Sequence, residues 1–161
     1  MWPSSTSGAA TNTLAETTTN LQDFYYLGFA DAASSYAQAN LMMPSDYDGS
    51  TITAQFVWTL GATASTGAVT WGAQWNQYKD GSNMDVAWGT AQEVTQNYGS
   101  ANTGSWSTIS SATSAITNGG VTGAASQLAL FRIYRRGAAT ADTQASVARL
   151  IGVMINYTRT A

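Results

Sequence analysis

The 161-residue chain contains no histidine and no cysteine, only two prolines and few charged side chains. It therefore has no imidazole for acid–base catalysis, no thiol nucleophile, no disulfide and no His/Cys zinc site. Charged residues make up 9% of the sequence, against about 25% in a typical soluble domain. About 40 serines and threonines supply the polarity of the surface instead.

The charge and hydropathy of the chain exclude two further classes of function. The net charge is −3, so there is no surplus of basic side chains to bind the phosphate backbone of a nucleic acid. The longest apolar stretch, residues 150–155, is interrupted by Gly152, whereas a membrane-spanning helix needs about 20 apolar residues. The first residues lack the pattern of a secretory signal, and the absence of cysteine is compatible with assembly in a reducing cytoplasm.

The first twenty residues differ from the rest because they are small and polar, with few apolar side chains. Such a segment cannot bury enough apolar surface to offset the entropy lost on ordering. We expect residues 1–20 to form a polar arm and residues 21–161 to form one domain. The arm is either a flexible terminus or a segment that orders on a partner, with Trp2 as an anchor.

From residue 21 onward the apolar pattern has a period of two, which is typical of strands with one buried face. Residues 51–60 and 69–76 alternate in this way, and turn-forming residues follow them at 61–67 and 79–83. About eight such short strands, spaced near ten residues apart, predict an all-β sandwich or barrel. We expect three tryptophans of these strands in its core: Trp58, Trp71 and Trp75.

The last two predicted strands, residues 127–136 and 148–158, carry apolar side chains on both faces. A strand of this kind is covered on both sides. The second cover is either a loop or the arm of the same chain, or another subunit, which the low surface charge favours. The side chains that we expect at such a subunit interface are Leu128, Leu130, Tyr134, Leu150 and Met154.

Arg132 alternates with apolar neighbours in the first of these strands and is expected to be buried. A buried guanidinium needs a carboxylate or several carbonyl groups to offset its desolvation. We predict a structural ion pair with Asp48, Asp85 or Asp142. The alternative is that Arg132 contacts a ligand or a partner.

The carboxylates show no clear metal-binding or catalytic arrangement. Residues 46–49, Asp-Tyr-Asp-Gly, have a partial calcium-loop pattern, but no glutamate closes the loop and a turn is expected there. Glu16 and Glu93 are the two glutamates, and no pair of carboxylates is marked for glycoside hydrolysis. The sequence also lacks a phosphate-binding loop and a nucleophile elbow. We expect no enzymatic activity, no metal and no cofactor.

Several aromatic residues fall near predicted loops, where exposed rings could stack on sugars or form an interface. These residues are Tyr47, Tyr78, Trp88, Tyr98 and Trp106. They leave open a sugar-binding platform as an alternative to packing.

Five separated segments are similar, in order and spacing, to segments of structural proteins of tailed bacteriophages. Residues 42–59 are similar to the pattern MPxDYDGGTVTxxFxWT of those proteins. The other four segments are VTWGAQ at 69–74, AWGTAQEV at 87–94, FRIYR at 131–135 and ARLIGV at 148–153. The resemblance covers about residues 41–157.

This resemblance implies an antiparallel jelly-roll β-sandwich, displayed on a virion as a homotrimer. Because the chain has only a short polar arm, it suits a capsid decoration or cement protein. Such a protein is assembled in the host cytoplasm, binds the major capsid protein on the outer capsid surface and stabilises the shell. We expect Trp2, Leu14 and Leu21 to anchor the arm to the capsid. The alternative is a receptor- or glycan-binding module of a tail or head fibre, with a host-surface glycan as its partner.

Overall fold

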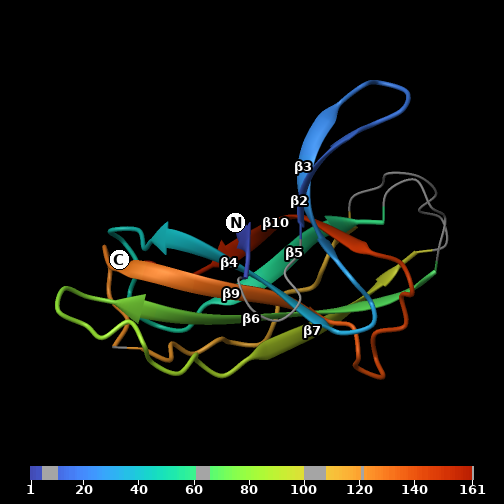
Figure 1. The fold of residues 1–161 in the computed structure, drawn as a ribbon. Helices are drawn as coiled ribbons and strands as arrows, with labels where there is room; N and C mark the ends of the chain where they lie inside the picture. Colours follow the sequence, from blue (N-terminus) through green and yellow to red (C-terminus); the bar gives the residue numbers. More distant parts are fainter. Residues whose placement is uncertain (5–10, 61–65, 100–107, 121, 161) are drawn as a thin grey trace.

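A computed structural model describes residues 1–4, 11–60, 66–99, 108–120 and 122–160. The described residues form ten strands and no helix. The strands make two five-stranded antiparallel sheets that pack face to face (Figure 1). The prediction of an all-β sandwich is therefore confirmed.

We call the two sheets sheet A and sheet B. Sheet A has the order β1 (Trp2–Pro3), β4 (Ser34–Met42), β9 (Leu128–Arg136), β6 (Gly67–Tyr78) and β7 (Gln92–Tyr98). Sheet B has the order β2 (Thr11–Glu16), β3 (Asp23–Phe29), β10 (Ala148–Asn156), β5 (Thr53–Thr59) and β8 (Thr108–Ile109).

The strands pair in a nested order. From β3 onward, the first strand pairs with the last, β4 with β9, β5 with β8, and β6 with β7, each pair antiparallel. The chain therefore behaves as one long antiparallel ribbon that is wrapped around a common core, with its strand pairs divided between the two sheets.

Aromatic side chains fill the space between the sheets, as the two-residue pattern predicts. Trp58, Trp71 and Trp75 are fully buried, which confirms their expected place in the core. The Trp71 ring stacks on Phe56 with centroids 5.6 Å apart, and Trp75 stacks on Phe131 at 5.7 Å. Offset ring pairs of this kind add to the stabilisation that burial alone provides.

The first twenty residues contribute an edge strand to each sheet. In sheet A, β1 pairs with β4 through Trp2 and Gln38, and in sheet B, β2 pairs with β3 along its whole length. The separation of an arm at residue 20 stays a prediction, but its strands have backbone partners in the same chain.

A β-bulge changes which side chains of β10 face the core. The register against β5 shifts between Leu150 and Gly152. Because one extra residue reverses the alternation, Leu150 faces inward before the bulge, and Val153 and Ile155 pack against the core after it. Leu150 is only 1% exposed. Our expectation that it faces outward was wrong, and it offers no surface to a second subunit.

The outward face of β9 is covered largely by the same chain. Tyr134 is only 6% exposed, because its ring lies over Gly72 of β6 and 5.5 Å from the ring of Tyr36 on β4. Leu128 and Leu130 are half-buried. Tyr134 is therefore covered by its own chain, whereas we had favoured cover by another subunit.

Candidate functional site

The β2–β3 hairpin projects beyond the body of the sandwich (Figure 1). Only Leu27, Gly28 and Phe29 of β3 pair with β10, whereas β2 and β3 stay paired as far as Glu16 and Asp23. The hairpin closes through residues 17–22, where the Leu21 amide donates to the Thr17 carbonyl at 3.0 Å.

The projecting part of the hairpin exposes apolar side chains. Leu14 and Tyr25 lie directly opposite each other across the two strands, so their side chains share one face. Leu14 is 50% exposed and Tyr25 is 65% exposed. Leu21, in the turn, is equally accessible. The hairpin therefore carries three large apolar groups away from the core of its own chain.

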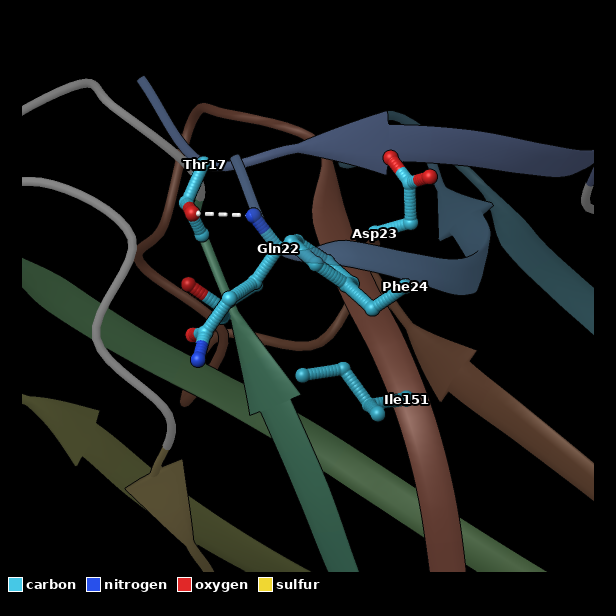
Figure 2. Close-up of a pocket in the computed structure, with 6 residues that line it drawn as sticks. Thr17, Gln22, Asp23, Phe24 and Ile151 are labelled. Atoms are coloured by element: carbon cyan, nitrogen blue, oxygen red, sulfur yellow. Dashed lines mark hydrogen bonds between the residues drawn. The ribbon is translucent and has the colours of Figure 1, made fainter. Parts of the chain in front are cut away.

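A hollow of about 560 Å³ lies where the hairpin leaves sheet B. Figure 2 shows Phe24 and Ile151 on its apolar side, with Thr17 and Gln22 at its rim. The backbone amide of Gln22 donates a hydrogen bond to the Thr17 hydroxyl at 2.9 Å, and this contact connects the two residues at the rim. The hollow is open and mixed in polarity, and it continues onto the sheet surface through Ile151.

The outward face of sheet B, meaning the outward side chains of β10, β5 and β8, carries little charge. Val57 lies opposite Ile109, and Met154 lies opposite Gln55. Ile109 and Met154 are both about half exposed. On the described part of these three strands, Arg149 is the one charged side chain, and its guanidinium lies 5.0 Å from the Tyr26 ring. The hairpin side chains Leu14 and Tyr25 lie on the other face of sheet B, since Tyr25 alternates with the buried Leu27 and Phe29.

The outward face of sheet A, on the opposite side of the sandwich, carries apolar side chains towards one end, Met42, Leu128 and Leu130, and polar and aromatic ones around Arg132. A register row crosses four strands and consists of Trp2, Gln38, Arg132 and Gln74. At about 4.8 Å between strands, this row is long enough to lie under an extended ligand.

Arg132 is fixed at the centre of this row. Its Nε donates to Oε1 of Gln74 at 2.9 Å, and its Nη2 donates to the same oxygen. The guanidinium carbon lies 5.3 Å from the Tyr36 ring centre and 4.9 Å from that of Trp88. Burial lowers the pKa of Arg132, and the neighbouring tyrosines partly oppose that shift.

The ion pair that we expected at Arg132 is formed by Arg135 instead. Arg135 donates to both carboxylate oxygens of Asp142, at 3.0 and 2.7 Å, and both side chains are buried. Arg132 has no carboxylate within salt-bridge distance in the described part of the chain. The prediction was wrong because Phe131, Ile133 and Arg135 face the core, which leaves Arg132 on the outward face.

The turn that we expected at residues 46–49 lies at residues 44–47, where the Tyr47 amide donates to the Pro44 carbonyl at 3.2 Å, and the chain bends again at Gly49. The Asp48 carboxylate accepts a hydrogen bond from the Ser50 backbone amide at 2.9 Å. The Ser50 side chain, and to a smaller extent this backbone amide, lower the pKa of Asp48. Asp46 pairs with Arg159 at 3.1 Å and accepts a hydrogen bond from Tyr157. Among the described residues, no three acidic side chains come together as a metal site would require.

Most of the aromatics that we placed near loops are buried rather than exposed. Tyr47, Tyr78 and Tyr98 belong to the interior, and burial raises the pKa of Tyr47 to about 12, with a smaller contribution from Asp48. Trp88 is half-buried beside Arg132. Trp106 lies outside the described residues.

The structure separates the predicted site residues into two groups. Leu128, Leu130 and Tyr134 lie on the outward side of sheet A, whereas Met154 lies on the outward side of sheet B. These side chains therefore form no single patch. The predicted anchors are also divided. The hairpin carries Leu14 and Leu21, and the edge of sheet A carries Trp2.

Sequence reasoning missed Tyr25 and Ile109 on sheet B and Tyr36 on sheet A. A signal existed for Tyr25, since residues 24–27 are four consecutive aromatic or apolar residues. We had used that same pattern only for the last two strands. No local signal distinguished Ile109 or Tyr36, because their exposure depends on which strands flank them.

In the part of the chain that the structure describes, no helix has the length and apolarity to cross a membrane. No family model, curated protein or solved structure matches the chain.

Proposed function

We propose that the chain is a non-enzymatic structural protein of a tailed-bacteriophage particle. In this role it is a homotrimeric decoration or cement protein on the outer capsid surface. The sequence resemblance supports the class of protein and the number of subunits. The nested strand order supports the finer fold, because an antiparallel ribbon of four strand pairs, wrapped into two sheets, is the arrangement expected of a jelly roll.

The observation that carries the proposal is exposed apolar surface in two places, on the projecting hairpin and on the outward face of sheet B. Exposed apolar groups that lie together usually mark an interaction site in a soluble protein. Here Leu14 and Tyr25 are exposed on a hairpin that projects from the described part of the sandwich, and Ile109 and Met154 are exposed on a face with little charge. A flat, weakly charged β face is suited to permanent contact with another protein, since obligate interfaces are more apolar than transient ones.

We assign the two parts of this surface to two contacts. The outward face of sheet B packs against other copies in the trimer, and the projecting hairpin reaches the neighbouring capsid subunits. This assignment keeps Leu14 and Leu21 as capsid anchors. It places the subunit interface, which we had expected on the second faces of both β9 and β10, on the outward side of β10, β5 and β8.

The proposed action is mechanical. A bound trimer connects neighbouring capsid subunits through three hairpins, and these contacts must break before the shell opens. Linking three weak contacts raises the overall affinity well above that of each one. The protein therefore binds the assembled shell much more tightly than it binds free capsid subunits.

Co-sedimentation with purified shells that lack the protein tests this function. The intact protein is expected to sediment with shells and to resist elution. The double variant Leu14→Asn and Tyr25→Asn is expected to lose most of its shell occupancy. Met84→Asn is the control, since Met84 is exposed on the β6–β7 connection away from the hairpin. The proposal is wrong if the intact protein stays in solution or if the hairpin variant decorates shells equally well.

A further inference from the structure

Arg132 is the starting point, because none of the carboxylates that the structure describes forms an ion pair with it. Of the other four arginines of the C-terminal region, Arg149 lies against the Tyr26 ring, and three have a carboxylate within 3.1 Å, namely Arg135, Arg136 and Arg159. Arg132 instead has a neutral amide oxygen and two aromatic rings. Its guanidinium is half-buried but not neutralised by the described residues.

The carboxylate of Glu93, on the same face of sheet A, does not pair with Arg132. Glu93 is the acidic side chain on this part of sheet A, opposite Gly72. Its Oε1 accepts a hydrogen bond from the Tyr134 hydroxyl at 2.8 Å, and its Oε2 pairs with Arg136 at 3.0 Å. Glu93 is therefore committed to two other groups on the same face.

Hydrogen bonds within the chain fix the position of the Arg132 guanidinium before any ligand binds. Gln74 accepts from the guanidinium through Oε1 and donates through Nε2 to the Gly89 carbonyl at 2.7 Å. The Gly89 amide in turn donates to Asn76 Oδ1 at 3.1 Å. These contacts fix the residue that follows Trp88, and a side chain at Gly89 would overlap the backbone at Thr117. The ring of Trp88 is thus positioned beside the guanidinium by the backbone around it.

The pattern of groups on this face indicates the chemistry of a ligand. A planar guanidinium with free N–H groups matches the two oxygens of a carboxylate. The amide of Gln38 lies between Arg132 and Trp2 in the same row, and amides can donate to and accept from hydroxyl groups. Trp2 and Trp88 are partly exposed, and aromatic rings of this kind can pack against the flat apolar faces of sugar rings.

We propose that the outward face of sheet A binds a carboxylate-bearing saccharide, with Arg132 holding the carboxylate and Trp88, Gln38 and Trp2 contacting the adjoining sugar units. An acidic peptide would also satisfy the guanidinium. The saccharide is favoured because ring faces and amides flank the cation in a row. No second basic residue lies in that row to pair with a run of acidic side chains.

This inference goes beyond the structural role proposed above and does not depend on it. The proposed contacts with other copies lie on the outward face of sheet B, on the opposite side of the sandwich, and the proposed shell contacts lie on the projecting hairpin. In an assembled particle the face around Arg132 would therefore remain available to a ligand from outside.

The test measures binding of the full, assembled protein to three carboxylated polysaccharides: polygalacturonate, hyaluronan and polysialic acid. Methyl-esterified polygalacturonate, which keeps the sugar rings but lacks the charge, and poly-glutamate are measured beside them. At least one carboxylated polysaccharide is expected to bind. Its neutral ester or carboxyl-reduced form is expected to bind at least about tenfold more weakly, as the loss of one charge-assisted hydrogen bond implies.

Two variants make the test specific. Arg132→Met is expected to reduce the affinity for the bound polysaccharide by about tenfold or more, by the same argument. Lys79→Gln removes the same charge at an exposed position just past the end of β6, five residues from Gln74. It is expected to leave the affinity within about twofold, because salt screens charges at that separation. Unchanged circular dichroism and solution mass of both variants show that folding and assembly are intact.

The proposal is overturned if none of the three polysaccharides binds. It is also overturned if Arg132→Met binds as well as the intact protein, or if the uncharged form binds equally. Binding of poly-glutamate alone would show that the face takes an acidic protein segment instead of a saccharide. None of these results bears on shell binding, which is measured separately.

Discussion

Arg135 and Asp142 form a buried, bidentate ion pair between β9 and the connection that follows it. Nη1 of Arg135 also donates to the carbonyls of Phe29 and Ser146, at 3.1 and 2.8 Å. One guanidinium therefore joins the end of β3, the end of β9 and the segment that leads into β10. It fixes the body of the sandwich at the end from which the hairpin projects.

Removing the carboxylate of this pair should destabilise the protein strongly. Asp142→Ala leaves a buried guanidinium without its counter-ion, for which the loss of unfolding free energy is about 3–5 kcal/mol. Arg136→Ala is the matched control, because that arginine is exposed in its pair with Glu93, and exposed pairs contribute about 1 kcal/mol or less. Denaturant unfolding of both variants provides the comparison. Equal losses would show that the buried pair does not hold this end of the fold.

Two strand glycines should respond differently to alanine. A methyl group at Gly72 would overlap the Tyr134 ring, whereas one at Gly152 meets nothing within 4 Å. Gly72→Ala is expected to lower the unfolding free energy by about 1–3 kcal/mol, because it displaces a packed ring. Gly152→Ala is expected to be neutral or to stabilise by about 0.5 kcal/mol through the unfolded state. If both variants unfold at the same denaturant concentration as the intact protein, Tyr134 does not pack on Gly72 as described.

Alkaline pH should destabilise the fold through its buried tyrosines. Burial raises the pKa of Tyr47 from 10.0 to about 12, and burial with the hydrogen bond to Glu93 raises the pKa of Tyr134 further. A raised pKa means that the folded state holds the proton more tightly than the unfolded state. The contribution is therefore complete below about pH 10 and is lost as the pH rises towards the folded-state pKa.

Unfolding by denaturant at neutral pH and at about pH 11 measures this loss. Tyr47→Phe should be less stable than the intact protein at neutral pH, since it loses the hydrogen bond to the Ser50 carbonyl. It should lose less stability between the two pH values. A loss as large as that of the intact protein would mean that Tyr47 does not contribute to the alkaline transition.

The strands and the core were predictable because they follow from local alternation. The pattern of residues 51–60 places Phe56 and Trp58 on one face whatever the strand pairs with. The identity of the buried arginine was also available from the sequence. Because side chains alternate along a strand, Arg135 is expected on the same buried face as Phe131 and Ile133. Asp142, seven residues later, is then available as its carboxylate partner. We had instead considered Arg132 because its immediate neighbours are apolar.

Other features depend on contacts that no local pattern encodes. The bulge after Leu150 reverses the facing of β10 because its register against β5 shifts by one residue, and the sequence around Ile151 and Gly152 carries no unique signal for that shift. The projection of Tyr25 depends on how early β3 leaves β10. The position of Trp88 over Arg132 depends on a connection that folds back over β6.

The outward face of sheet B can be tested at one position. Met154→Lys places a charge in the proposed subunit contact, where burying an unpaired charge is strongly unfavourable. The variant is expected to dissociate to single chains with its fold intact, since Met154 is exposed in the chain alone. Met84→Lys, at an equally exposed methionine of the β6–β7 connection, is expected to leave the assembly unchanged. If both variants keep the same mass, the contact does not involve this face.

The mass of the intact protein in solution, measured by light scattering at micromolar concentration, is the most direct test of the central claim that the chain assembles with itself. A permanent trimer should persist on dilution to this range and give three times the 16.9 kDa of one chain. A mass of 16.9 kDa would contradict the claim, because Ile109 and Met154 would then face solvent in the working protein.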